Sequence, residues 1–266
     1  MNLPLSHPPR ERDASGFACL LYALDGLGAF TGRVHFLAGG EPCGEALLDR
    51  GDLCYVRGTP GHARLGELLV GRDPSARDAV AAGVARARAR GCALGTALLE
   101  DDPRHLLSLR GALRDQMLAG LHSLAALGTP IHFERLPTAQ AAPGAIRFSA
   151  LELMLTAAAP ATEALHALHE ALGAGARRAL LAREDGVVHA ARGVASLREA
   201  GRLARDGWNQ MGVASFDGTA PRLLLRRDGE TSRVLALHDD TLAVFEGLGL
   251  GDQVRAMRLA GALDGR

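Results

Sequence analysis

The chain has 266 residues, with 30 basic side chains that are all arginine and 30 acidic ones, so its formal net charge is zero. A length of this order corresponds to one large domain or to two of ordinary size. A zero net charge argues against a general nucleic-acid-binding protein, because neutralising phosphates requires a basic surplus. Aromatic residues make up 4% of the chain, so we expect a core of Leu, Val and Ala.

The apolar pattern contains neither a secretory signal nor a membrane span. Residues 1–16 contain prolines and a run of mixed charge, which predicts a flexible tail. No window reaches the roughly 18 apolar residues of a membrane span, so we expect no membrane insertion and a cytoplasmic location. The cysteines lack a C-x-x-C spacing and predict free thiols in a reducing compartment, without a disulfide or a zinc site. They are Cys19, Cys43, Cys54 and Cys92.

The first half of the chain predicts a small antiparallel meander combined with helices. Alternating apolar residues indicate short strands, and Arg50–Gly51–Asp52 is a hairpin turn signal. The clearest helix covers 104–127, where leucines recur every three or four residues. The expected helices are 17–25, 63–70, 75–90, 104–127 and 150–158, and the expected strands are 33–37, 43–48, 53–56, 131–133 and 146–148.

The second half has a different pattern of predicted helices and strands, which begins after a domain boundary at 159–161. Glu184–Asp185–Gly186 and Asp239–Asp240 are typical of hairpin turns. The predicted order is α-β-β-α-β-β-β-α, so we expect an α+β chain with an N-terminal meander and a C-terminal sandwich. The helices are 162–172, 194–212 and 250–262, and the strands are 178–183, 187–191, 222–226, 232–238 and 242–246.

Residues 161–266 resemble the roadblock family of small α+β regulatory domains. The resemblance rests on this order and on ALLAREDGVVHAARG at Ala179–Gly193, in which two apolar strands flank a D-G turn and a glycine precedes the long helix. It implies a domain without chemistry of its own that forms a homodimer. The expected partner is a Ras-like small GTPase or another roadblock protein.

Residues 17–158 resemble the PATAN-type domain of bacterial regulators. The resemblance implies regulation without catalysis and a second protein partner at this domain. The segments that carry it are Thr31–Val34, Leu48–Gly58, Leu65–Leu69, Phe133–Glu134 and Ile146–Ser149.

The predicted long helix 194–212 contains a seam of residues spaced by three and four, as in coiled coils. Its small residues allow a second helix to approach closely, and its large ones supply contact area. Two interpretations stay open: the seam forms a dimer interface near a twofold axis, or it packs on the domain's own sheet. The seam consists of Val194, Leu197, Gly201, Ala204, Trp208 and Met211.

An alternative function concerns a cyclic dinucleotide. Arg64–Leu65–Gly66 recurs loosely at Leu94–Gly95, and the pattern resembles the R-L-G-x-x-L modules of some secretion and pilus ATPases that bind cyclic dinucleotides. Arg64, Gly66 and Gly95 are then the candidate ligand-binding residues. The second copy lacks the arginine and the first lacks a downstream glutamine, so helix packing is the competing interpretation.

Catalytic chemistry has little support in the sequence. His166 and His169 lie one helical turn apart, but no third ligand follows at a recognisable spacing for a metal. Nucleotide phosphate loops and serine-hydrolase elbows are not found. We therefore expect no catalytic residues, no metal and no cofactor. The sequence predicts a non-catalytic bacterial regulatory or scaffold protein that acts in motility, pilus or polarity control.

Overall fold

The computed structural model describes residues 16–58, 64–138, 145–158, 163–213, 223–228, 231–249, 251–255 and 258. The chain divides into two compact units. Among the described residues, the first is formed by those within Leu27–Ser149, and the second joins those from Ala150 onward to Gly16–Gly26. The second unit therefore contains more than the expected 161–266, because two further helices pack within it.

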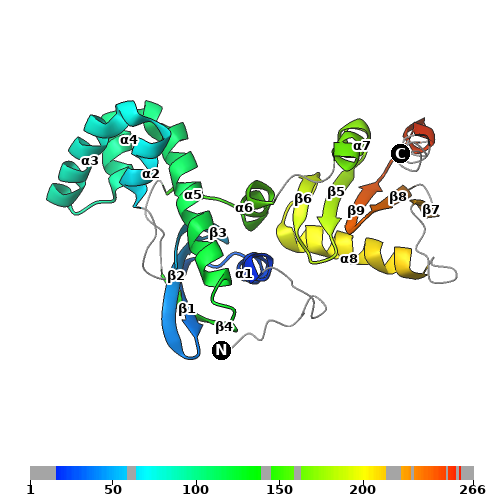
Figure 1. Ribbon diagram of the computed structural model, residues 1–266, viewed down its shortest axis with the longest axis horizontal. Helices are drawn as coiled ribbons and strands as arrows, with labels where there is room; N and C mark the ends of the chain where they lie inside the picture. Colours follow the sequence, from blue (N-terminus) through cyan, green and yellow to red (C-terminus); the bar gives the residue numbers. More distant parts are fainter. Residues whose placement is uncertain are drawn as a thin grey trace. The chain divides into compact units, whose positions relative to one another are not determined.

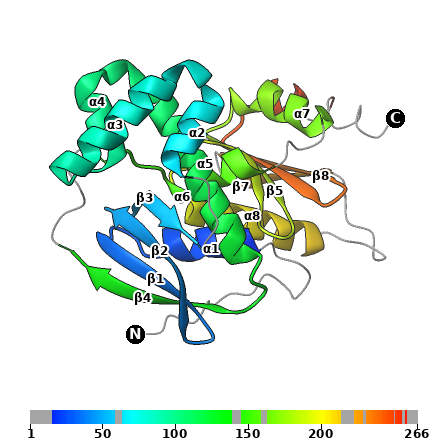
Figure 2. The same cartoon turned by 60° about the vertical axis from the view of Figure 1, so that its left-hand side comes forward.

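The first unit contains a four-stranded antiparallel sheet in the order β3-β2-β1-β4 (Figure 2). Glycines with positive φ form the tight turns of the meander, at Gly39–Gly40 and at Gly51. The predicted strand at 131–133 is longer and pairs with β1. The strands are β1 (Gly32–Ala38), β2 (Glu41–Asp49), β3 (Asp52–Arg57) and β4 (Ile131–Pro137).

In the described part of the first unit, four α-helices accompany this sheet. The longest, α5, packs on β3, where a Cβ on Gly120 would lie 3.1 Å from the carbonyl oxygen of Val56. The glycine thus permits the close approach of helix and strand. One short helix, α4, lies between the predicted helices and was not expected as a separate element. The helices are α2 (Leu65–Arg72), α3 (Arg77–Arg90), α4 (Leu94–Asp101) and α5 (Leu106–Ala125).

The second unit contains a five-stranded antiparallel sheet in the order β6-β5-β9-β8-β7 (Figure 1). The predicted order of elements is confirmed up to the last strand, and residues 251–255 are helical. The other residues of the predicted helix 250–262, except Arg258, lie outside the described residues. The elements are α1 (Gly16–Asp25), α6 (Ala150–Ala157), α7 (Glu163–Gly173), β5 (Arg178–Arg183), β6 (Val188–Arg192), α8 (Leu197–Val213), β7 (Leu223–Asp228), β8 (Thr231–His238) and β9 (Thr241–Glu246).

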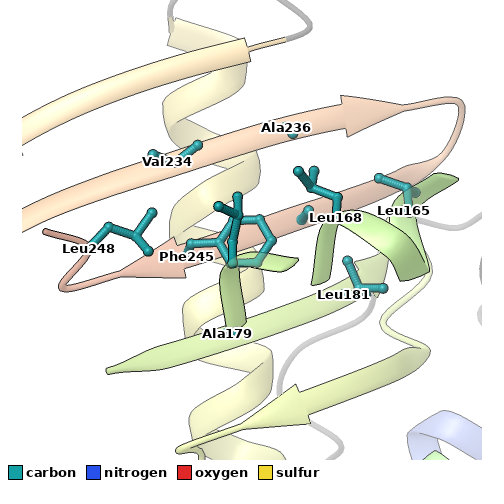
Figure 3. Packing of buried hydrophobic residues seen from close by; sticks show 10 residues of the cluster. Leu165, Leu168, Ala179, Leu181, Val234, Ala236, Phe245 and Leu248 are labelled. Carbon is teal, nitrogen blue, oxygen red and sulfur yellow. The ribbon is translucent and has the colours of Figure 1, made fainter. Parts of the chain in front are cut away.

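Helices cover both faces of this sheet, and the chain is an α+β protein. On one face, leucines of α7 pack against alternate residues of β5, β8 and β9, among them Phe245 (Figure 3). The residues between them on the same strands point to the opposite face, since side chains alternate along a strand. That opposite face lies under α8.

Candidate functional site

Helix α8 packs closely on the sheet of the second unit. A Cβ on Gly207 would lie 2.7 Å from a methyl carbon of Leu242 and 3.2 Å from one of Val244. Leu235 lies 3.5 Å from the same point. Gly207 therefore marks where the helix crosses β8 and β9. The sequence interpretation missed this residue, although a glycine inside a long helix is a recognised sign of close packing.

The predicted dimer seam lies mostly inside the unit. Leu197, Ala204 and Met211 are buried within the chain itself. Val194, just before α8, and Trp208 are half-buried. The apolar side of α8 is thus used to cover the sheet, as the competing interpretation of the seam proposed. A role of these six residues between two chains stays a prediction.

The remaining seam residue, Gly201, is covered by α1. A Cβ at Gly201 would lie 2.7 Å from the ring of Tyr22, whose hydroxyl donates to the carbonyl oxygen of Gly186 over 3.0 Å. One turn further along α1, the carboxylate of Asp25 accepts from the backbone N–H of Arg198 at 2.7 Å. Helix α1 is therefore fixed to the start of α8 by packing and by hydrogen bonds.

A row of charged side chains crosses the α8 side of the sheet. Arg178, Glu246 and Arg233 lie opposite one another on β5, β9 and β8. Glu246 pairs with both arginines, and Arg178 also donates to Glu199 of α8 at 2.9 Å. A backbone N–H from Ala195 and the guanidinium of Arg178 hold the pKa of Glu199 below its ordinary value. The row joins the sheet to the first turn of α8.

The two edges of the five-stranded sheet differ. Helix α6 packs against strand β6. Strand β7 pairs with β8 on one side only, and no strand of the described chain pairs with its other side. Leu225 of β7 is 40% exposed, and Arg226 and Arg227 beside it are exposed. The sequence predicted this strand but not its edge position, because strand order depends on long-range pairing.

In the first unit, the candidate glycines of the cyclic-dinucleotide alternative lie at helix contacts. A Cβ at Gly66 would lie 3.2 Å from Val80, and one at Gly95 would lie 3.1 Å from Leu109. Helix packing therefore accounts for both glycines. Arg64 is exposed, and its backbone N–H donates to Glu67 at 2.9 Å. Ligand binding by Arg64, Gly66 and Gly95 stays a prediction, which calorimetry with the dinucleotide and an Arg64→Ala variant tests.

The two motif copies also end alike. Asp73 and Asp102 each precede a proline and accept from the backbone N–H two residues later, at 3.0 and 2.9 Å. Hydrogen bonds from Arg104 lower the pKa of Asp102 to about 2. These bonds start the short turns Pro74–Ala76 and Pro103–His105, so the order of short helix, Asp-Pro turn and longer helix occurs twice in this region.

The histidines considered for a metal site have different environments. His169 is buried beside Phe245, and burial lowers its pKa. His166 is half-buried. Within the described ranges, no group of three metal-ligating side chains comes together.

A shallow cavity of about 720 Å³ lies beside β4 in the first unit. Its lining includes Phe30, His132 and Arg135, and none of the residues predicted for a site. Separately, no helix in the described part of the chain is long and apolar enough to cross a membrane.

The geometry thus defines a two-unit α+β protein with one open sheet edge in the described part of its second unit. No family model matches the chain. No curated protein matches it either. Among solved structures, it is similar to one described as MglB with tetrameric arrangement, at 24% identity over 40% of this chain and 88% of that chain, with a TM-score of 0.30. It is also similar to Myxococcus xanthus MglB, at 14% identity over 40% of this chain and 90% of that chain, with a TM-score of 0.29. Similarities at these scores establish no shared function.

Proposed function

We propose that the chain is a non-catalytic regulator whose second unit forms a homodimer and binds a Ras-like small GTPase. The observation that carries the proposal is the edge strand β7, which leaves backbone groups available for a further strand on its free side in the described part of the chain. An edge strand of this kind accepts the same strand of a second copy about a twofold axis.

The difference between the two sheet edges supports β7 as the assembly edge. Helix α6 packs against β6, so addition of a strand there requires displacement of a helix. At β7, the exposed Leu225 supplies apolar surface for a partner strand. A continuous sheet through two copies of β7 therefore displaces no helix or strand among the described residues of the unit.

The GTPase part of the proposal follows the roadblock resemblance of residues 161–266. A domain of this kind acts on a bound GTPase by stabilising one position of the GTPase's own switch segments. The PATAN resemblance of residues 17–158 supports a second partner at the first unit, and the field of action that we propose is motility, pilus or polarity control.

Capture of small GTPases by the full-length chain tests this function. Each Ras-like GTPase of the host is loaded with GDP or with a non-hydrolysable GTP analogue and is titrated against the immobilised protein. We expect one GTPase to bind more tightly in one nucleotide state, because a regulator must distinguish the states. Absence of binding by every GTPase in both states would refute the GTPase assignment.

A further inference from the structure

The outward side of α8 carries a stripe of arginines that the proposed dimer does not use. Arg198, Arg202 and Arg205 are all exposed, and Asn209 continues the stripe. Their spacing of four, three and four residues places them on one side of the helix. Since Ala200, Ala204 and Met211 are buried against the sheet, this side faces away from it.

No hydrogen bond or ion pair to the described residues engages the three guanidinium groups, although Arg202 interacts electrostatically with Glu199 and Arg198 lies beside Gly26 at the end of α1. Arg178, Arg183 and Arg233 of the sheet all form ion pairs with carboxylates. No carboxylate of the described residues lies within ion-pair distance of Arg198, Arg202 or Arg205. The nearest turn of α1 uses Asp25 for the backbone N–H of Arg198.

The local charge contrasts with a chain that is neutral overall. The exposed charged residues on α8 are the three arginines and Asp206. Asp206 lies toward one flank of the stripe, on the same side as Glu199. The exposed side of α8 is therefore positive along the arginine stripe and acidic along the flank that carries Asp206. This arrangement favours one lateral position of a bound acidic group.

We propose that this stripe, Arg198–Arg202–Arg205, is a docking surface for an acidic segment of a protein partner. Arg198 and Arg205 are separated along the axis by about 10 Å, which equals two turns of a facing helix. Carboxylates repeated at i, i+4 and i+7 on that helix match the three guanidinium groups, which bind carboxylates in a two-pronged geometry. The proposal does not depend on dimerisation through β7 or on the GTPase.

A protein segment fits this surface better than a membrane does. The apolar side of α8 lies on the sheet, so the helix has no apolar surface to insert into lipid. Three arginines alone attract an anionic bilayer weakly.

The test uses the full-length chain and two labelled peptides. One peptide is an alanine-based helix with Glu at i, i+4 and i+7, and the other has Gln at those positions. We expect the Glu peptide to bind more tightly than the Gln peptide, with an affinity that falls as salt is raised. An Arg202→Gln/Arg205→Gln variant is expected to weaken this binding about five- to tenfold.

The matched control is Arg77→Gln/Arg88→Gln, which removes two exposed arginines of α3 and should leave binding unchanged. Thermal melting of both variants checks that neither change unfolds the chain. Equal binding of the two peptides, or equal loss in both variants, would overturn the proposal. Loss of binding to phosphatidylserine vesicles in the Arg202→Gln/Arg205→Gln variant, with peptide binding unaffected, would also overturn it and assign the stripe to lipid.

Discussion

Gly207 and Gly212 have different surroundings although both lie in α8. Gly207 faces three side chains of the sheet, whereas a Cβ on Gly212 would have no atom within 4 Å. In a helix, glycine is less favourable than alanine by about 1 kcal/mol, so it is retained at a cost. At Gly207 the close approach of the sheet explains that cost.

Gly207→Ala is therefore expected to destabilise the chain by about 1–3 kcal/mol, because the added methyl group overpacks the contact with Leu242 and Val244. The matched variant Gly212→Ala should be neutral or stabilising by up to about 1 kcal/mol. Urea unfolding of both variants measures the difference. Equal stability of the two variants would show that α8 does not approach the sheet as described.

A second residue-scale prediction concerns Glu199. Its pKa is held below the ordinary value of 4.5, first by the backbone N–H of Ala195 and then by Arg178. A lowered folded-state pKa means that the ionised carboxylate stabilises the folded chain above about pH 4.5, and that this contribution is lost as the pH falls through the lowered pKa. Glu199→Gln should thus reduce stability at pH 7, with a difference that shrinks below pH 4.5.

Unfolding midpoints at several pH values check this dependence. Glu184→Gln is the control, since Glu184 is exposed and forms no ion pair among the described residues. A constant difference between Glu199→Gln and the wild type from pH 7 to 3 would contradict the role given to the carboxylate.

At the scale of elements, α1 belongs to the second unit although Leu27–Ser149 of the first unit lie between it and the rest of the second unit in the chain. Tyr22 and Asp25 make this connection through Gly186, Gly201 and the first turn of α8. The unit is consequently built from two distant parts of the sequence.

Tyr22→Phe removes the hydroxyl that donates to Gly186 and is expected to cost about 1 kcal/mol. The rate of amide hydrogen exchange should rise in α1 and in the first turns of α8, because the two helices stabilise each other. Tyr55→Phe, at a half-buried tyrosine of β3, should leave that exchange unchanged. Faster exchange in both variants, or in neither, would argue against the anchoring of α1 by Tyr22.

The helices and strands of the second unit could be predicted from the sequence, whereas the contacts between distant elements could not. Periodic leucines and D-G turns predict α8, β5 and β6 because these signals are local. The position of β7 at an edge and the packing of α1 on α8 depend on pairing between distant segments. The seam on α8 could be predicted because its spacing is local, but a seam looks alike whether it faces a sheet or a second chain.

At the scale of the whole molecule, we propose that two copies of the chain assemble through one strand, β7. Leu225 and the free side of β7 are the surface that the described part of the sheet offers to a second copy. Lysine at position 225 removes the exposed apolar surface of β7 and adds a third consecutive cation to Arg226 and Arg227, and such charge on an edge strand opposes further pairing. Because Leu225 is already partly exposed, Leu225→Lys should block pairing without unfolding the unit.

Light scattering coupled to size exclusion, on the full-length chain, tests this claim most directly. We predict a dimer for the wild type and a monomer for Leu225→Lys at the same concentration. The control Leu107→Lys, at a residue of α5 that is 80% exposed, should remain a dimer. A monomeric wild type, or a dimer that persists in a folded Leu225→Lys variant, would contradict assembly through β7.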